Sequence, residues 1–225
     1  MKKSQEDIFI TSEADAWFER NISKATEAAS KEHNVIKGMI SCKLPISGSF
    51  IDLGGGTGTV AAGIIKLFPK WKGTVLEPSQ KARTLGLKTF PMVDFIHGSL
   101  SKKENIPNKS YDLAIISMVF TWIDRNLLSQ AIANTDSLVK PGGHIIIQDF
   151  YAPFPKINNY HHKEGLFTYK QDYTLPFIAL NTYLELYKKT SSISHANYDN
   201  KDPYDVWLTT SVLQKDLIDQ YQKTI

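Results

Sequence analysis

The stretch "FIDLGGGTGTVAAGI", from Phe50 to Ile64, constrains the fold of this chain more than any other part of it. An apolar run ends near Asp52, a glycine-rich turn follows, and a second apolar pattern begins near Thr57. This order is typical of a buried strand, a tight loop and a helix whose first N–H groups face a ligand. Glycine is needed there because a Cβ atom would block the approach of the ligand or forbid positive φ angles. The stretch therefore predicts a binding loop at the carboxyl end of a strand.

The spacing of the glycines fits two kinds of ligand. Gly54, Gly56 and Gly58 form the pattern G-x-G-x-G. Read one step later, Gly56, Gly58 and Ala61 form G-x-G-x-x-A, which is typical of dinucleotide-binding loops. Asp52 stands at the tip of the strand, where its negative charge would repel a pyrophosphate and attract an ammonium group. The local charge therefore favours an adenosine cofactor that carries an amino-acid group over NAD.

Glu77, in "TVLEPS", marks the predicted end of the next strand. A carboxylate at this position can accept hydrogen bonds from both hydroxyls of a ribose. Because both kinds of cofactor contain a ribose, Glu77 does not distinguish them. The length of the chain is more informative, since only residues 151 to 225 follow the last predicted parallel strand. That leaves little room for the catalytic domain that a dehydrogenase would need.

Apolar runs alternate with amphipathic stretches along the central part of the chain, which predicts a parallel sheet covered by helices. The predicted strands are Ser49 to Leu53, Gly73 to Glu77, Asp94 to His97, Tyr111 to Ser117 and Gly143 to Phe150. The predicted helices between them are Thr57 to Phe68, Ser79 to Leu87 and Leu127 to Val139. In "SEADAWFERN", the helical spacing of Ala14, Trp17 and Phe18 predicts a further amphipathic helix before the first strand.

The last third of the chain breaks this rhythm. Residues Tyr151 to Thr174 are rich in aromatic residues, His and Pro, and so long a loop favours a binding lid over an idle connection. A helical pattern from Leu175 to Lys189 predicts a long helix. The runs Ser192 to Tyr198 and Asp205 to Gln214 predict an antiparallel hairpin at the edge of the sheet.

Composition narrows the class of protein. The chain has 225 residues, of which 42% are hydrophobic, and a formal net charge of +3, so we expect one globular domain over 1–225. The basic residues are scattered, which argues against a nucleic-acid partner. Cys42 is alone, no leader-like apolar segment follows Met1, and no apolar run is long enough to span a membrane. We therefore expect a cytoplasmic protein without a membrane partner.

Five segments together resemble a known family. "FIDLGGGTG", "VLEPS", "FIHGSL", "YDLAIISMVFTWID" and "LVKPGGHIIIQDF" have the order and spacing of the class I S-adenosylmethionine-dependent methyltransferases, over roughly Trp17 to Gln214. The resemblance implies an α/β, Rossmann-like fold: a seven-stranded, mostly parallel sheet with an antiparallel last strand and helices on both faces. It also implies that the glycine loop binds S-adenosyl-L-methionine.

Matching residue by residue, the resemblance assigns a set of cofactor contacts. Asp52, Gly54 and Gly56 match the motif around the methionine moiety, and Glu77 matches the ribose-binding acid. The full predicted set is Arg20, Asp52, Gly54, Gly56, Glu77, Pro78, Ser99, Leu100, Ser117 and Met118. One position departs from the pattern: many relatives carry Asp where this chain has Ser99, so the resemblance does not imply a carboxylate contact to the adenine amino group here, and a Ser hydroxyl or the backbone could replace it.

In this family the acceptor side comes from the N-terminal helix and from the segments after the fourth and fifth strands, which here are Trp17 to Arg20, Val119 to Trp122 and Asp149 to Tyr173. We expect residues 1–45 to form an N-terminal helical lid and residues 151–190 to form a substrate-side insertion. The predicted substrate-binding residues are Trp17, Trp122, Asp149, Tyr151, Tyr169 and Tyr173. If the acceptor is a hydroxyl, a general base helps, and His161 and His162 in "NNYHHKEG" are the candidates.

Other histidines and a metal site are less favoured. His97 and His144 stand at strand ends, where a structural role is expected, and His195 is predicted to lie in a strand. Adjacent histidines tend to point apart in an extended chain, and "IISMVF" lacks the carboxylate that metal-dependent O-methyltransferases place there, so we expect no metal. The same segment lacks the Asn/Asp-Pro-Pro-aromatic motif of nucleic-acid base methyltransferases.

The combined hypothesis is an enzyme that transfers a methyl group from S-adenosylmethionine to an O or N atom of a small molecule. The segment "EADAWFERN" is similar to methyltransferases of surface-polysaccharide or secondary-metabolite pathways, which favours a sugar or a secondary metabolite as acceptor. Two alternatives stay open. One is aminopropyl transfer, although Ser117 stands where those enzymes carry a catalytic Asp. The other is a cofactor-binding subunit without turnover. The sequence predicts no oligomeric state.

Overall fold

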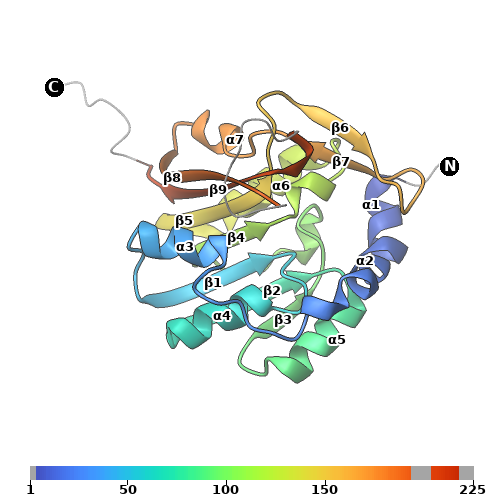
Figure 1. Cartoon of the computed structure of the whole chain (residues 1–225). Coiled ribbons are helices and arrows are strands. Elements are labelled where there is room, and N and C mark those ends of the chain that lie inside the picture. The colour runs from blue at the N-terminus through green and yellow to red at the C-terminus, as the bar shows by residue number, and fades with distance from the viewer. Residues whose placement is uncertain (1–3, 194–203, 218–225) are drawn as a thin grey trace.

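Seven strands form one sheet in the order β3-β2-β1-β4-β5-β9-β8 in a computed structural model that describes residues 4–193 and 204–217 (Figure 1). Strands β1 to β5 pair in parallel. Strand β9 is antiparallel to β5, and β8 is antiparallel to β9. Their bounds are β1 (Ser47–Leu53), β2 (Lys70–Glu77), β3 (Asp94–His97), β4 (Tyr111–Ser117), β5 (Val139–Phe150), β8 (Tyr183–Ser192) and β9 (Trp207–Lys215).

Successive side chains of each strand point to opposite faces of the sheet, so the buried core has two parts, one on each face. Ile51 and Leu53 of β1 face a cluster that includes residues of α6 (Leu128–Ser137) and α7 (Leu175–Ile178). Phe50 points to the other face, where α3 (Asn34–Ser41) and α4 (Thr59–Leu67) cover the sheet. Asp52 shares the alternation of Phe50, so its side chain belongs to the α4 side.

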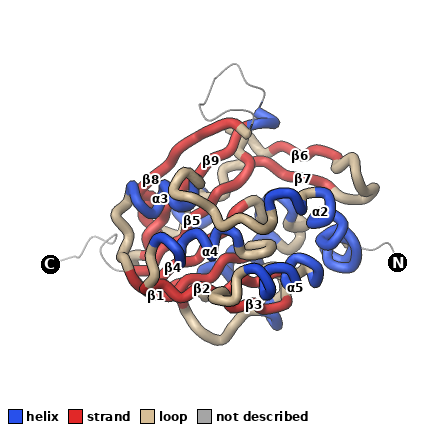
Figure 2. The backbone as a smooth tube through the Cα atoms, turned by 60° about the horizontal axis from the view of Figure 1, so that its bottom comes forward, coloured by secondary structure: helices blue, strands red, loops and turns tan. Residues whose placement is uncertain are grey.

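The N-terminal segment is a continuous helical rod made of three parts. These are α1 (Gln5–Ile8), a π-helical turn η1 (Phe9–Glu13) and α2 (Ala14–Arg20). The rod packs on α5 (Gln80–Thr89) at one end. At the other end it lies beside a two-stranded sheet of β6 (Lys156–Asn159) and β7 (Phe167–Lys170), which extends beyond the main sheet (Figure 2). Short 3₁₀ turns occur at Ile22–Lys24, Lys103–Asn105, Phe120–Trp122 and Tyr204–Val206.

The predicted fold is confirmed: a mostly parallel seven-stranded sheet whose last strand is antiparallel, with helices on both faces. The third and fourth predicted strands have the bounds of β3 and β4. The other predicted parallel strands and the three helices between them are all present, with ends that differ by a few residues. These strands and helices bury one face or both, so their apolar residues recur at a regular spacing that is easily recognised in the sequence.

The long helix predicted from Leu175 to Lys189 is wrong. Helix α7 ends at Ile178, Asn181 has a φ of 51°, and β8 begins at Tyr183. The apolar residues Leu184 and Leu186 remain exposed, so their spacing does not mark a buried helical face. Pairing with β9 decides the structure of this segment.

The predicted C-terminal hairpin exists, but its first strand is β8 rather than Ser192 to Tyr198. Ser192 is the last residue of β8, not the first residue of a strand. The second predicted strand corresponds to β9. His195, predicted to lie in a strand, is outside the described residues.

Candidate functional site: a cavity at the carboxyl ends of the parallel strands

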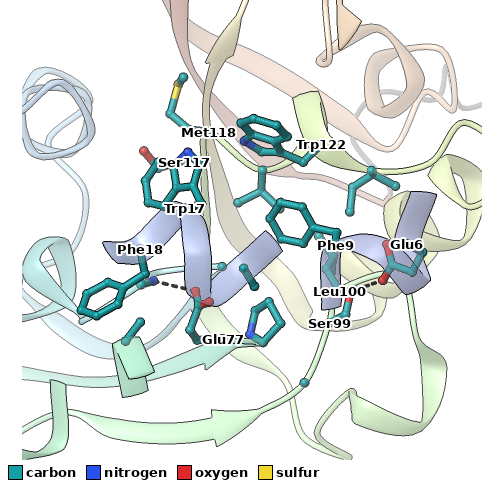
Figure 3. Close-up of a pocket in the computed structure, with 18 residues that line it drawn as sticks. Glu6, Phe9, Trp17, Phe18, Glu77, Ser99, Leu100, Ser117, Met118 and Trp122 are labelled. Carbon is teal, nitrogen blue, oxygen red and sulfur yellow. Dashed lines mark hydrogen bonds between the residues drawn. The ribbon is translucent and has the colours of Figure 1, made fainter. Parts of the chain in front are cut away.

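The strand order of the sheet reverses at β1, which has β2 on one side and β4 on the other. In open α/β sheets, ligands bind in the crevice at such a switch point, beyond the carboxyl ends of the strands. A cavity of ≈ 820 Å³, its open mouth included, lies there. It is lined by Glu6, Phe9, Ala14, Trp17, Phe18, Gly54, Gly56, Glu77, Pro78, Ala82, Gly98, Ser99, Leu100, Ser117, Met118, Val119, Trp122 and Ile123 (Figure 3).

The glycine loop forms one wall of the cavity. Gly54 and Gly56 have φ angles of 72° and 59°, which L residues with side chains rarely adopt. A Cβ atom on Gly54 would stand 2.6 Å from Cγ2 of Val119, so the loop and the segment after β4 meet closely only because Gly54 has no side chain. At Gly56 a Cβ atom would enter open space within the cavity. The loop therefore leaves its backbone open to a ligand.

Glu77, at the end of β2, fixes the glycine loop through its side-chain carboxylate. Its Oε2 accepts a hydrogen bond of 2.8 Å from the N–H of Gly56, and its Oε1 accepts one of 2.8 Å from the N–H of Ser79. Burial raises the pKa of Glu77 to about 7, against the two backbone hydrogen bonds, which lower it. Each carboxylate oxygen keeps a further acceptor site, so Glu77 can serve the loop and a ligand together.

Asp52, at the tip of β1, is 1% exposed, and neither of its oxygens accepts a hydrogen bond from any described residue. Burial, and next the charge of Glu77, raise the pKa of Asp52 to about 7. A carboxylate buried without a partner is costly, so this position calls for a positively charged or hydrogen-bond-donating ligand. Asp52 is not itself among the lining residues but lies behind the glycine loop, with its carboxylate 2.6 Å from where a Cβ on Gly55 would stand.

The segment after β4 makes the opposite wall. Met118 has a φ of 62°, which is unusual for a residue with a long side chain. Asp149 of β5 holds this bend, because its Oδ2 accepts hydrogen bonds from the N–H groups of Val119 and Thr121, at 3.1 and 3.3 Å. Burial raises the pKa of Asp149 to about 7, and its backbone hydrogen bonds act in the opposite direction. A strained backbone held by its surroundings is common at functional sites.

Aromatic side chains from the N-terminal rod close the cavity. Phe9, Trp17 and Phe18 come from the rod, and Trp122 faces them from the segment after β4 (Figure 3). The rings of Phe9 and Trp122 have centroids 5.7 Å apart. Phe9 is the first residue of the π-helical turn, a feature that occurs frequently at functional sites. Together these rings give the cavity an apolar, enclosed side.

The cavity brings together ten of the residues predicted to bind cofactor or substrate. They are Trp17, Gly54, Gly56, Glu77, Pro78, Ser99, Leu100, Ser117, Met118 and Trp122. Their individual contacts to a ligand stay predictions. The predicted residues that do not line the cavity are Arg20, Asp52, Asp149, Tyr151, Tyr169, Tyr173, His161 and His162.

Several residues outside the lining have other partners. Arg20 donates hydrogen bonds to Glu13 and to the hydroxyl of Tyr160. The guanidinium of Arg125 lies 4.0 Å from the ring centroid of Tyr169, and the Tyr173 hydroxyl donates to the Tyr169 carbonyl. The ring of Tyr151 stacks on Trp207 with a centroid distance of 6.3 Å.

His161 and His162 lie exposed in the turn between β6 and β7. Their rings contact Tyr160, with centroid distances of 5.8 and 5.3 Å. Tyr160 in turn meets Trp122 edge to face, at 4.8 Å. One aromatic ring therefore separates the histidine pair from a lining residue.

Phe18 and Val119 lie in predicted acceptor-side segments, but the sequence did not predict Glu6, Phe9, Ala14, Ala82, Gly98 and Ile123 as lining residues. The signal for Glu6 and Phe9 was helical spacing, since Glu6, Phe9, Glu13 and Trp17 follow one another at steps of three and four. Glu6 and Phe9 precede the segment in which the helix was predicted, so their face of the rod was not considered.

No helix within residues 4–193 and 204–217 is both long and apolar enough to cross a membrane. In the same two ranges, His, Cys, Asp and Glu side chains form no group of three or more that could hold a metal ion.

The cavity fits an adenosine cofactor that bears an amino-acid group. Glu77 lines the cavity and keeps free acceptor sites, and Asp52, directly behind the glycine loop, is a buried carboxylate with no hydrogen-bond partner among the described residues. The glycine loop exposes backbone where a ligand must approach closely. A pyrophosphate would meet two carboxylates here, which disfavours a dinucleotide.

Comparison with known proteins finds matches over the part of the chain that contains the glycine loop. Residues 51–145 match the family described as "Methyltransferase domain". The chain is 28% identical over 107 residues to malonyl-[acyl-carrier protein] O-methyltransferase of Halalkalibacterium halodurans, covering 45% of this chain and 39% of that protein. It is 31% identical over 103 residues to strychnine O-methyltransferase of Strychnos nux-vomica, covering 44% and 27%. The matched part thus spans well under half the length of either relative.

Solved structures resemble the chain over most of its length. The 1,6-didemethyltoxoflavin-N1-methyltransferase of Burkholderia thailandensis, solved with S-adenosylhomocysteine, has a TM-score of 0.68 at 12% identity, covering 96% of this chain and 92% of that chain. The glycopeptide N-methyltransferase MtfA, also solved with S-adenosylhomocysteine, has a TM-score of 0.60 at 13% identity, covering 91% and 98%. Residues 51–145 are thus similar to the methyltransferase domain family, and the chain has the fold of the class I S-adenosylmethionine-dependent methyltransferases that its sequence motifs resemble.

Proposed function

We propose that this protein transfers a methyl group from S-adenosylmethionine to a nitrogen or oxygen atom of a small molecule. One observation carries the proposal: a single cavity contains both a glycine loop held by Glu77 and an aromatic wall formed by Phe9, Trp17 and Trp122. The first part suits the polar cofactor, and the second suits an organic acceptor from which water is excluded.

The relatives support both acceptor atoms. The two sequence relatives are named O-methyltransferases, and two of the similar structures are named N-methyltransferases. Their acceptors differ widely in size, so the names do not select one acceptor for this chain. The enclosed aromatic wall favours an acceptor with an apolar or planar portion, which includes many secondary metabolites.

The bound cofactor supplies a methyl group on a positively charged sulfur, which is reactive towards a nucleophile. The residues of the chain have to bind, align and desolvate the two reactants, since alignment alone contributes a large part of the acceleration of a bimolecular transfer. Glu77 and Asp52 would fix the ribose and the ammonium group. The bend at Met118, held by Asp149, would fix the wall beside the transferred group. Phe9, Trp17 and Trp122 would exclude water.

A turnover assay tests this proposal. The full chain is incubated with S-adenosylmethionine and a panel of phenols, amines, sugars and heteroaromatic compounds, and release of S-adenosylhomocysteine is measured. Acceptor-dependent release, absent in a Gly54→Val variant that blocks the loop against Val119, is expected. If S-adenosylmethionine binds but no acceptor class gives release, the alternative of a cofactor-binding subunit without turnover is favoured.

The histidine pair remains the candidate general base for a hydroxyl acceptor. Because His161 and His162 lie behind Tyr160, this role needs an acceptor that extends past Trp122 towards the β6–β7 turn. With such an acceptor, replacing both histidines by Ala should lower kcat by roughly 10²–10⁴-fold and leave cofactor affinity unchanged. With an amine acceptor the same change should mainly raise KM.

A structure with S-adenosylhomocysteine bound decides the question independently of the acceptor. The proposed role ends if both imidazoles lie more than about 10 Å from the sulfur while the β6–β7 turn is ordered, because proton transfer needs hydrogen-bond distance or one bridging water.

A further inference from the structure

Glu6 is a buried carboxylate that the N-terminal rod carries into the cavity. It is 4% exposed and lines the cavity next to Ser99 and Leu100, which follow β3 (Figure 3). Its Oε1 accepts hydrogen bonds from two hydroxyls, those of Ser99, at 2.6 Å, and Ser101. A residue near the start of the chain is thus joined to a loop more than 90 residues away.

Only one of the two oxygens of Glu6 is used in this way. Among the described residues, none donates a hydrogen bond to Oε2, and no Lys or Arg forms an ion pair with this carboxylate. Oε2 is also not among the fully enclosed polar atoms that lack partners, so it is reachable. A carboxylate out of bulk water needs donors for its remaining acceptor sites. Glu6 therefore presents an acceptor towards a ligand that donates a hydrogen bond.

The position of Glu6 is fixed by hydrogen bonds on both sides of it. The side-chain amide of Gln5 donates to the carbonyls of Trp122 and Phe167, at 2.8 and 3.0 Å, and its Oε1 accepts from the N–H of Phe167. Further along the rod, Asp15 accepts from the hydroxyl of Ser79 at 2.6 Å. Glu6 is thus held at a defined place rather than carried on a free arm.

The residues around this carboxylate outline a slot for a purine. Glu77, which suits a ribose, and Glu6 are both lining residues, and Pro78 and Leu100 add apolar surface to the same lining. Adenine has apolar faces and one amino group at its edge, whereas the opposite nitrogen is attached to the ribose. If the ribose lies at Glu77 and the ring lies against Pro78 and Leu100, the amino group would point away from Glu77, towards the end of the cavity where Glu6 meets Ser99.

We propose that Glu6, held by the hydroxyls of Ser99 and Ser101, accepts a hydrogen bond from the 6-amino group of the cofactor's adenine. This inference rests on the proposed function, since it takes S-adenosylmethionine as the ligand. It assigns to the N-terminal rod a carboxylate contact that the loop after β3 does not itself supply, because that loop carries Ser99. Selection for adenine then depends on the rod being docked.

A thermodynamic cycle tests the pairing of Glu6 with the amino group. The two ligands are S-adenosylhomocysteine and its analogue with hydrogen in place of the 6-amino group, titrated calorimetrically into the full chain and into Glu6→Ala. The unchanged protein should prefer the amino ligand by about 10-fold or more, because a charge-assisted hydrogen bond is lost with the analogue. In Glu6→Ala the preference should fall to within about 2-fold.

Two further variants make the result interpretable. Glu6→Gln keeps an acceptor for Ser99 and Ser101, so it serves if the Ala variant fails to fold, and it too should lose most of the preference. Glu19→Ala is the matched control, since Glu19 lies on the same rod but is exposed and paired with Lys81. It should keep the full preference.

An unchanged preference in both Glu6 variants would overturn the assignment while leaving the proposed function intact. Failure of the unchanged protein to bind S-adenosylhomocysteine at all would instead refute the proposed function, and this inference with it.

Discussion

Replacing Glu77 by Ala is expected to weaken binding of S-adenosylhomocysteine by roughly 10²–10³-fold, the largest effect on affinity of any single change in this protein. Two contributions add. The ribose would lose its acceptors, and the N–H groups of Gly56 and Ser79 would lose the oxygens that hold them at 2.8 Å. The glycine loop would then have to be ordered by the ligand itself. Isothermal titration calorimetry on the full chain measures the change.

Two control variants separate the role of Glu77 from a general loss of structure. Glu77→Gln keeps one oxygen acceptor but sets an amide NH₂ against a backbone donor, so it should lose most of the affinity as well. Glu32→Ala removes an exposed carboxylate whose partner is Lys37, at 2.9 Å, and should leave affinity unchanged. A folded Glu77→Ala protein that binds within about 3-fold of the original would contradict the assignment of this carboxylate to the ligand.

Replacing Asp52 by Asn is expected to weaken S-adenosylhomocysteine binding by about 10-fold or more while making the ligand-free protein more stable. Affinity falls because the ammonium group of the ligand loses its buried carboxylate. Stability rises because Asp52 has no hydrogen-bond partner among the described residues and sits near the charge of Glu77. Opposite signs for the two quantities are a signature of a group kept for binding rather than for folding.

The gain in stability should depend on pH in a defined direction. Burial raises the pKa of Asp52 from its ordinary value of 3.8 to about 7 in the folded protein. Between these values the folded state binds more protons than the unfolded state, so this group makes the free energy of unfolding fall as pH rises. Because the amide of Asn cannot titrate, the stability advantage of the Asp52→Asn variant over the original protein should be small at pH 4 and largest above pH 7.

Urea unfolding of both proteins without ligand, at pH 4, 5.5, 7 and 8, measures this difference. Groups that do not interact with Asp52 titrate alike in both proteins and cancel in the comparison. Glu77 does not cancel, but losing the charge of Asp52 lowers its pKa in the folded variant, which adds to the advantage of the variant at high pH. An advantage that shrinks as pH rises would show that Asp52 has a partner that stabilises its charge.

The sequence alone predicted the part of the molecule in which local chemistry and fold coincide. Gly54, Gly56 and Glu77 could be assigned because a loop between a strand and a helix needs glycine wherever a ligand approaches, and because the ends of parallel strands meet at one edge of the sheet. The core strands could be predicted because residues such as Leu113 and Ile115 are fully buried. A strand buried on both faces appears in the sequence as a continuous apolar run.

What the sequence did not predict depends on contacts between distant segments. Strand β8 contains Leu184, Glu185 and Leu186, which favour a helix locally, and only its pairing with β9 makes it a strand. Glu6 could not be assigned to the cavity because its partner Ser99 is far along the chain and the docking of the rod is set by Gln5 and Asp15. The residues around the acceptor also come from distant segments, so their contacts could not be predicted from the sequence.

The central claim is that the cavity at the ends of β1, β2 and β4 holds S-adenosylmethionine rather than a dinucleotide. Calorimetric titration of the full chain with S-adenosylhomocysteine and, separately, with NADH tests it most directly. We expect one site with micromolar affinity for S-adenosylhomocysteine and no measurable binding of NADH. Tight binding of NADH with none of S-adenosylhomocysteine would contradict it.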